Sequence, residues 1–167
     1  MAKKATKAAK NVLYQARMEA ATWNEKLSSR EGAAEVTGID RTRIAYMELG
    51  TVTPYPEEIL LLADYYNAPE LMNHYCSHMC PLGKQTVEPI ELKELTTATL
   101  QLLSSLRDIP EITDELVDIA EDGVIDKDEA SAMEGILRKL RQAAKKIHTL
   151  ELIYQKKLCS PGGESDG

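Results

Sequence analysis

Residues 29–50, SREGAAEVTGIDRTRIAYMELG, predict two short helices joined by a tight turn. Gly38 is expected to end the first helix, because glycine reaches positive φ without strain. Asp40 is expected to cap the second helix, since its carboxylate can accept from the free N–H groups of the next turn. The small residues 32–34 would let the second helix approach closely. This pattern is typical of a DNA-binding helix-turn-helix, whose second helix enters the major groove N-terminus first.

The composition around this stretch predicts an all-α protein. Of the 167 residues, 43% are hydrophobic, with one Trp and no Phe, so the core would be aliphatic and rich in Tyr. Long alternating runs of β-branched residues are absent, and apolar residues recur at helical spacing instead. We expect a flexible basic arm at 1–10, a helix-turn-helix domain at 11–83, a linker at 84–87, a helical bundle and dimerisation region at 88–158, and a disordered tail at 159–167.

Charge is divided unevenly along the chain. The net charge is −7, which is unusual for a DNA-binding protein. Residues 1–50 carry a net +3, however, and residues 51–167 carry a net −10. Because phosphate binding depends on the local field, the charge of the whole chain does not exclude DNA. The acidic half is expected to be kept away from DNA.

The sequence predicts neither a membrane segment nor a signal peptide. No apolar run reaches the roughly 18 residues that span a bilayer, and the basic start MAKKATKAAK lacks the apolar region of a signal peptide. The three cysteines, Cys76, Cys80 and Cys159, are an odd number. These features favour a reducing, cytoplasmic location.

Helical spacing continues on both sides of the central stretch. Residues 11–27 carry an apolar stripe and predict a helix. Further helices are expected at about 57–66, after Pro56 and Pro54 in a short loop, and at 69–78.

Motif residues extend over this whole half of the chain. They are Ser29-Arg-Glu, Ala34, Gly38-Ile39, Arg41-Thr-Arg-Ile44, Glu48-Leu-Gly50, Pro54, Leu60, Ala63 and Tyr66. Over residues 11–83 the chain resembles the lambda-repressor/Cro-type regulators, often called the XRE family, and most closely a subgroup from Gram-positive bacteria and their mobile elements. Two residues depart from the pattern: Asp40 stands where Ser is commoner, and Gly32 lies in mid-helix.

The resemblance implies a five-helix lambda-repressor-like DNA-binding domain with its recognition helix at about 40–49. In this kind of fold the first helix packs on the recognition helix, so Arg17 and Glu48 either form an ion pair or stay solvated. Arginine is the side chain best matched to guanine O6 and N7, and the start of the preceding helix suits a phosphate. The expected DNA-binding residues are Ser29, Arg30, Arg41, Thr42, Arg43, Tyr46 and Thr51.

The C-terminal half carries wide apolar stripes. Residues 92–109 follow a coiled-coil-like heptad spacing that Pro110 is expected to end. A short helix is expected around 112–119 and a long one at about 127–158. Stripes of this width suit a bundle, which either packs only within the chain or also self-associates. A homodimer through residues 88–158 would supply the two half-site contacts that such repressors need.

Two segments have metal-ligand residue types without a complete site. Residues 118–129 match an EF-hand loop at six positions, but Ala120 lacks a ligand. The simpler interpretation is that Gly123 ends one helix and Asp126 caps the next. In HYCSHMC at 74–80, the His and Cys pairs lie about 200° apart around a helix. We therefore predict no metal and no cofactor, the weak candidates being Asp118, Asp122, Asp126 and Glu129 for calcium and Cys76 and Cys80 for zinc.

The sequence does not predict an enzyme, because no nucleophile, base and orienting group are arranged for catalysis. The favoured function is a sequence-specific DNA-binding transcriptional regulator, a repressor that acts as a dimer on a double-stranded operator. The alternative is a protein-interaction module, antitoxin-like or an anti-regulator, whose acidic helical half binds a protein partner.

Overall fold

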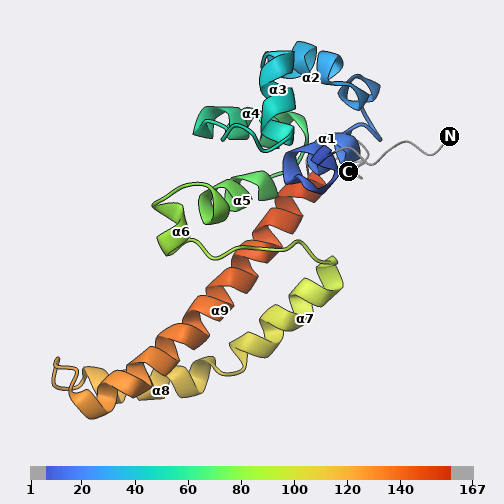
Figure 1. Ribbon diagram of the computed structural model, residues 1–167. Helices are drawn as coiled ribbons and strands as arrows, with labels where there is room; N and C mark the ends of the chain where they lie inside the picture. The colour runs from blue at the N-terminus through green and yellow to red at the C-terminus, as the bar shows by residue number, and fades with distance from the viewer. Residues whose placement is uncertain (1–6, 159–167) are drawn as a thin grey trace. The chain divides into compact units, whose positions relative to one another are not determined.

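The computed structural model describes residues 7–158, and every regular element among them is a helix (Figure 1). The chain is therefore all-α, as its periodicity predicts. Contacts between residues divide it into two compact units. The first unit contains the chain up to Ile90 together with the end of the C-terminal helix from Gln155, and the second contains residues 91–154.

The first unit is a cluster of short helices around one aliphatic core. Its elements in chain order are η1 (Lys7–Lys10), α1 (Val12–Ala20), η2 (Glu25–Ser28), α2 (Arg30–Thr37), α3 (Arg41–Glu48), α4 (Pro56–Tyr65), α5 (Glu70–His78) and α6 (Gly83–Thr86). Nearly every one of them contributes apolar side chains to the core. The buried core residues are Leu13, Ala16, Ala20, Leu27, Ala33, Ile39, Ile44, Met47, Ile59, Leu62, Ala63, Tyr66, Ala68 and Leu71.

The first helix is shorter than the stripe at 11–27 predicts. α1 ends at Ala20, and a turn leads into the 3₁₀ helix η2. The side chain of Asn24 caps η2 by accepting from the backbone N–H of Lys26 (3.2 Å). Because such local hydrogen bonds compete with a continuing helix, Leu27 reaches the core from η2 rather than from α1.

The arm expected at 1–10 is in part regular structure. Residues Lys7–Lys10 form η1, and the side chain of Ala8 is fully buried. The remainder of that arm, residues 1–6, and the tail expected at 159–167 lie outside the described residues.

The connection after α5 also differs from the expectation. α6 occupies most of the linker expected at 84–87, and α7 begins only at Leu95. Between these two helices the side chain of Asn73 holds the chain: its Nδ2 donates to the carbonyl of Glu88 (3.0 Å), and its Oδ1 accepts from the N–H of Ile90 (2.9 Å). One buried amide thus holds the backbone on both sides of Pro89, and these peptide groups are not available to a helix.

The second unit is formed by α7 (Leu95–Leu106), α8 (Ile109–Ala120) and most of α9 (Lys127–Leu158). The long helix matches the range predicted from the apolar spacing. Pro110 lies in the first turn of α8, where its missing N–H costs no hydrogen bond, so it begins a helix as well as following one. The core between α8 and α9 contains Ile112, Ile119 and Ile136, with Ile109, Leu116, Met133 and Leu140 packed against them.

The last turn of α9 belongs to the first unit through the side chain of Lys156. Its Nζ lies 2.7 Å from a carboxylate oxygen of Glu70 and 2.9 Å from one of Glu19. The backbone carbonyl of Lys156 accepts a hydrogen bond from Asn67 Nδ2 (2.9 Å). The end of the described chain is therefore tied to α1 and to α5.

Candidate nucleic-acid interface

The helices α2 and α3 form the helix-turn-helix that residues 29–50 predict. The Oγ of Ser29 accepts from the N–H of Gly32 (3.0 Å) at the start of α2, and α2 ends at Gly38, whose φ is 74°. Asp40 then caps α3 by accepting from the N–H groups of Thr42 (2.8 Å) and Arg43 (3.1 Å). The carboxylate of Asp40 therefore stabilises the turn and faces the positive end of the α3 dipole.

Gly32 has a different role from the one expected for residues 32–34. A Cβ atom at this position would collide with the backbone carbonyl of Lys26 in η2. The small residue therefore permits the approach of η2 to α2, rather than that of α3. Gly32 is the third residue of α2, so it lies in the first turn and not in mid-helix as expected, and this contact explains why glycine stands there.

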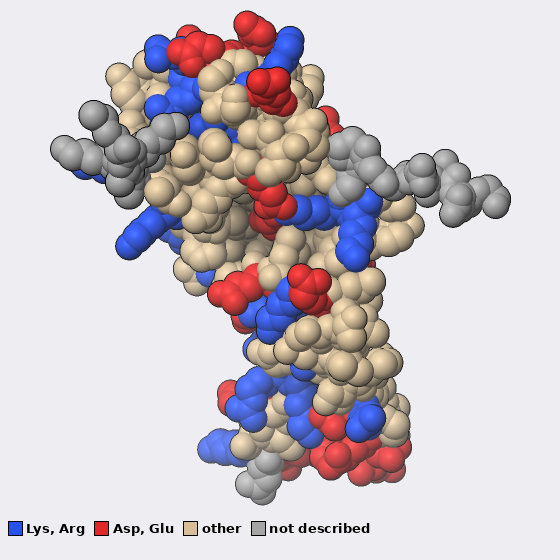
Figure 2. All heavy atoms as spheres, turned by 90° about the vertical axis from the view of Figure 1, so that its right-hand side faces the viewer, with Lys and Arg blue, Asp and Glu red and all other residues tan. Residues whose placement is uncertain are grey.

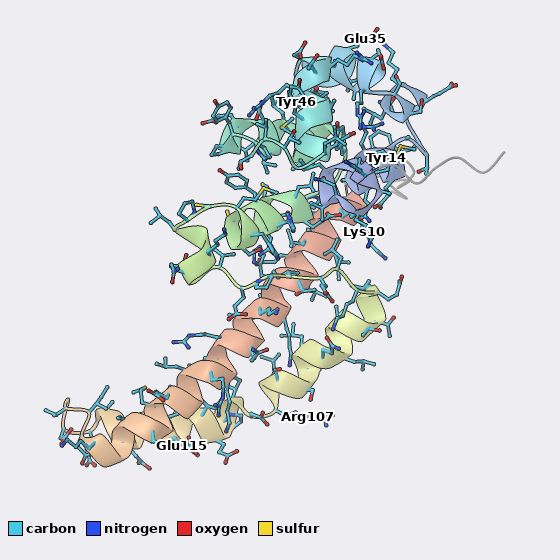
Figure 3. All side chains as sticks on the ribbon, viewed as in Figure 1. Lys10, Tyr14, Glu35, Tyr46, Arg107 and Glu115 are labelled. Atoms are coloured by element: carbon cyan, nitrogen blue, oxygen red, sulfur yellow. The ribbon has the colours of Figure 1, made fainter. Side chains whose placement is uncertain are left out.

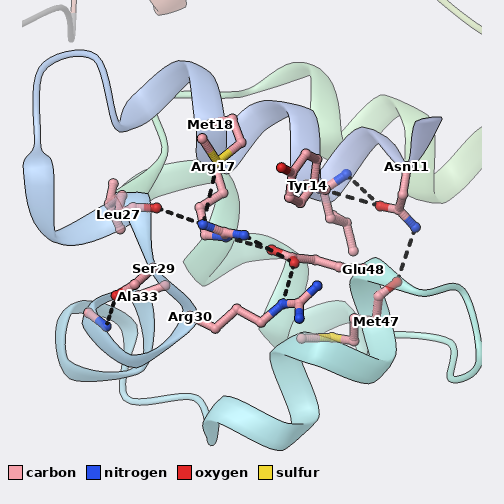
Figure 4. A network of polar contacts seen from close by, with 12 residues as sticks. Asn11, Tyr14, Arg17, Met18, Leu27, Ser29, Arg30, Ala33, Met47 and Glu48 are labelled. Carbon is pink, nitrogen blue, oxygen red and sulfur yellow. Dashed lines mark hydrogen bonds and ion pairs between the residues drawn. The ribbon is translucent and has the colours of Figure 1, made fainter. Parts of the chain in front are cut away.

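A buried ion-pair network joins α1, α2 and α3 (Figure 4). The Nε of Arg17 lies 2.6 Å from Glu48 Oε1, and the two side chains are only 3% and 2% exposed. A second Arg17 nitrogen donates to the carbonyl of Leu27 (2.8 Å), and Arg30 Nε donates to Glu48 Oε2 (2.7 Å). Of the two alternatives open for Arg17 and Glu48, the structure therefore shows the ion pair, and Arg30 joins it.

The network keeps Arg17 charged in spite of its burial. Desolvation acts to lower the pKa of its guanidinium, but the hydrogen bond and the negative charge of Glu48 outweigh it, and the pKa lies above its ordinary value. A charge buried with its partner fixes the position of the helix that carries it. The helix α3 is therefore held to α1 at its C-terminal end.

Arg43 of α3 is bound to α4. Its Nε and Nη2 donate to the two carboxylate oxygens of Glu58, at 2.7 and 2.8 Å, and its guanidinium lies 4.7 Å from the centre of the Tyr55 ring. Nη2 also donates to the carbonyl of Thr53 (3.2 Å). The hydrogen bonds from Arg43 hold the pKa of the Glu58 carboxyl below its ordinary value. This geometry suits a brace between helices more than a base-reading side chain.

Arg41, Thr42 and Tyr46 are the exposed residues of the recognition helix among those predicted to contact DNA. Arg41 is 61% exposed and pairs with Glu31 of α2 at 2.5 Å. Tyr46, labelled in Figure 3, lies one turn further on and is 49% exposed. An exposed ion pair of this kind is weak, so Arg41 can exchange Glu31 for another anion or acceptor.

Two predicted phosphate contacts lie at the ends of the motif. The hydroxyl of Ser29 caps α2, and the Oγ1 of Thr51 donates to the Tyr46 carbonyl (3.1 Å) just after Gly50, whose φ is 70°. Both side chains are exposed. Arg30, by contrast, directs its Nε to Glu48 and keeps 30% of its side chain exposed.

The two segments with metal-ligand residue types differ in what their side chains contact. Asp126 and Glu129 form a reciprocal cap at the start of α9: Asp126 Oδ1 accepts from the Glu129 N–H (2.9 Å), and Glu129 Oε2 accepts from the Asp126 N–H (3.1 Å). Gly123, with a φ of 74°, follows the end of α8. Cys76 and Cys80 are free thiols. Within residues 7–158, no three His, Cys, Asp or Glu side chains are placed to hold one metal ion.

Sequence reasoning missed the acidic partners of α3. Glu58 in the first turn of α4 accepts from Arg43 and from the backbone N–H of Tyr55 (2.7 Å). Glu31 pairs with Arg41, and its pKa is lowered, first by a hydrogen bond from its own backbone N–H and then by Arg41. The acidic pair 57–58 directly after Pro56 marks the start of a helix and could have indicated a carboxylate at that position.

Comparison with known proteins does not identify this surface further. No family model matches the chain, and no curated protein and no solved structure is detectably similar to it. None of the helices within residues 7–158 is long and apolar enough to cross a lipid bilayer.

Proposed function

We propose that the protein is a sequence-specific DNA-binding transcriptional regulator of the XRE type, acting as a repressor in the bacterial cytoplasm. The observation that carries the proposal is the exposure of Arg41, Thr42 and Tyr46 on a capped helix that buried ion pairs hold in place. A rigid helix with an exposed arginine in its first turn suits insertion into the major groove.

Each predicted contact has a distinct role in this proposal. Arg41 leaves Glu31 and donates to guanine O6 and N7, while Thr42 and Tyr46 contact neighbouring base edges. Ser29 and Thr51 position the motif on the phosphates on either side. Arg43 acts indirectly, because its bonds to Glu58 set the angle of the recognition helix.

The second unit supports assembly into a homodimer on double-stranded DNA. Leu100, Leu103 and Leu106 recur every three residues along α7, and each of their side chains is more than 40% exposed. A second copy of residues 88–158 would cover such a stripe. Two recognition helices would then reach half-sites roughly 34 Å apart, one turn of DNA.

Selection from random duplex DNA tests the proposal. We expect an enriched palindrome, and we expect the Arg41→Ala protein to bind it about tenfold or more weakly, since a good bidentate contact contributes about 1–3 kcal/mol. The control is Arg138→Ala, which removes an exposed arginine from the second unit. A selection without an enriched sequence contradicts the proposal.

The acidic end of the second unit favours a second candidate, a module that binds a protein partner. Residues 108–129 contain ten Asp and Glu and one Lys, and Figure 2 shows acidic side chains gathered at the end where α8 meets α9. Val117, Val124 and Ile125 are more than half exposed within this segment. A stoichiometric partner from a pull-down, with no sequence from the DNA selection, would favour this candidate.

A further inference from the structure

The chain passes between its two compact units at two places. It leaves the first unit after Ile90 and returns to it at Gln155, near the end of α9. At each crossing, side chains of the first unit bind the residues next to it. We call these contacts the first anchor, at residues 88–90, and the second anchor, at Lys156.

The first anchor is one buried amide. The side chain of Asn73, a residue that is 5% exposed, donates to the carbonyl of Glu88 and accepts from the N–H of Ile90. Pro89, between them, has no N–H of its own to donate. Removal of the amide would leave a donor and an acceptor without these partners, so residues 88–90 would be released from α5.

The second anchor combines ion pairs with a hydrogen bond to the backbone. Lys156 Nζ pairs with Glu70 and Glu19, and the carbonyl of Lys156 accepts from Asn67 Nδ2. The last four carbonyls of an α-helix have no partner within the helix, so Asn67 supplies a donor to the end of α9. Burial acts to lower the pKa of Lys156, but the hydrogen bonds to the two carboxylates outweigh it, and the pKa lies above its ordinary value.

The contact is specific to Lys156. The side chain of Glu70 is 24% exposed, and its Oε2 is buried without a hydrogen-bond partner within residues 7–158. Loss of Lys156 would therefore leave a partly buried carboxylate without its cation. Lys157, the next residue, is exposed and forms no ion pair within the described part of the chain. Lys157 is thus a matched control for Lys156.

One short segment, residues 67–73, supplies all the anchoring side chains except that of Glu19. The anchoring residues recur every three positions and are Asn67, Glu70 and Asn73. Ala68 and Leu71, which lie between them, are buried in the core of the first unit. The segment that holds both ends of the second unit is therefore itself part of the core of the first.

We propose that residues 67–73 couple the stabilities of the two units, so that a partner that binds and stabilises the second unit also stabilises the first. A ligand that binds only the folded form of a unit shifts its unfolding equilibrium, and coupling between two sites is reciprocal. The partner would be a second copy of the chain or another protein. This inference does not depend on the proposed DNA-binding function, because it concerns the stability of the chain alone.

Urea unfolding of the full chain, followed by tryptophan fluorescence, tests the coupling. Trp23 is the only tryptophan of the chain and lies in the first unit between α1 and η2, so its signal reports on that unit. Ile119→Ala removes a side chain from the core between α8 and α9 in the second unit. We expect this substitution to lower the Trp23 midpoint by about 1 M urea.

Loss of the two anchors should remove this effect. In the Lys156→Met, Asn73→Ala double variant, the Trp23 midpoint should not change when Ile119→Ala is added. Lys156→Met alone should reduce the shift, and this variant keeps the test valid if the double variant does not fold. Lys157→Met should leave the whole shift in place.

The coupling is disproved if Ile119→Ala does not move the Trp23 midpoint of the otherwise unchanged chain. It is also disproved if the whole shift persists in Lys156→Met and in the double variant. If Ile119→Ala prevents the second unit from folding, Gly135→Ala gives a perturbation of the opposite sign. An added Cβ at this position of α9 has no atom within 4 Å, so the gain in helix propensity should raise the Trp23 midpoint only while the anchors are intact.

Discussion

Arg43 and Glu58 form a bidentate ion pair between α3 and α4, with N–O distances of 2.7 and 2.8 Å. The pair binds one arginine of α3 to the protein itself. Arg41, two residues earlier, is exposed and paired only with an exposed glutamate. Arg43 therefore joins two helices of the protein, whereas Arg41 is available to an external partner. Substitution of each arginine can distinguish these two roles.

Alanine at position 43 should mainly lower stability, and alanine at position 41 should mainly weaken DNA binding. Arg43→Ala should lower the free energy of unfolding by about 1 kcal/mol, because a partly buried ion pair is lost. Arg41→Ala should leave stability within about 0.5 kcal/mol of the parent and weaken binding to the selected DNA. Urea unfolding and a DNA titration of both variants measure the difference. Equal effects of the two variants on stability would contradict the assignment.

The Arg43–Glu58 pair should also make stability depend on acid pH. The pKa of the Glu58 carboxyl is lowered in the folded protein, from an ordinary value of 4.5. Its contribution is therefore fully present above that value and is lost as the pH falls through the folded pKa. The parent should exceed Glu58→Gln in stability at pH 7, and the gap should close below about pH 4.5. A gap that does not change between pH 7 and pH 3 would exclude this ionisation as its cause.

Loss of Glu48 should destabilise the first unit far more than loss of an exposed partner. Glu48→Ala leaves Arg17 charged and buried, and breaking such a pair costs about 3–5 kcal/mol. The control is Lys26→Ala, which removes an exposed pair with Glu35 at 3.6 Å and should cost less than about 0.5 kcal/mol. Chemical denaturation of the two variants gives both values. Similar losses of unfolding free energy in the two variants would mean that the buried network adds little to the stability of the first unit.

Alanine should have opposite effects at two helical glycines. Gly32→Ala places a Cβ against the backbone of Lys26 and should destabilise by about 1–3 kcal/mol. Gly135 in α9 has no atom within 4 Å of such a Cβ, so Gly135→Ala should stabilise by about 0.5–1 kcal/mol through helix propensity. Thermal unfolding of both variants checks the signs. A stabilised Gly32→Ala protein would disprove the close contact between η2 and α2.

Calcium should leave the start of α9 unchanged. Asp126 and Glu129 accept from each other's backbone N–H groups, and Ala120 provides no ligand in the third loop position. Asp126→Ala should cost about 1 kcal/mol as a lost helix cap, with or without calcium. A calcium titration followed by NMR should give no saturable shift in residues 118–129. Saturation at millimolar calcium would restore the EF-hand interpretation.

The local features of the helix-turn-helix could be predicted because the signals are short in range. Ser29, Gly38 and Asp40 act on N–H or C=O groups within a few residues, so the chain alone indicates where α2 and α3 begin and end. The Arg17–Glu48 pair was one of the two alternatives that the resemblance left open, because it implies that the first helix packs on the helix that carries Glu48. The long helix α9 followed from its apolar spacing.

The contacts that depend on tertiary structure could not be predicted. The direction of Arg43 is decided by Glu58, fifteen residues further along the chain. The connection at 88–90 is held by the amide of Asn73, seventeen residues before Ile90. In both cases the partner lies outside the window over which spacing is informative. The end of α1 has a local cause instead, because the cap at Asn24 begins η2 within the stripe that continues to Leu27.

The contacts of Lys156 have a consequence for the order in which the protein folds. Glu19 and Glu70 are synthesised long before the residue that neutralises them. At about 5–20 residues per second, the N-terminal helices emerge from the ribosome several seconds before their last partner. The nascent first unit therefore spends that interval without these two ion pairs, which form only after the end of α9 has been translated.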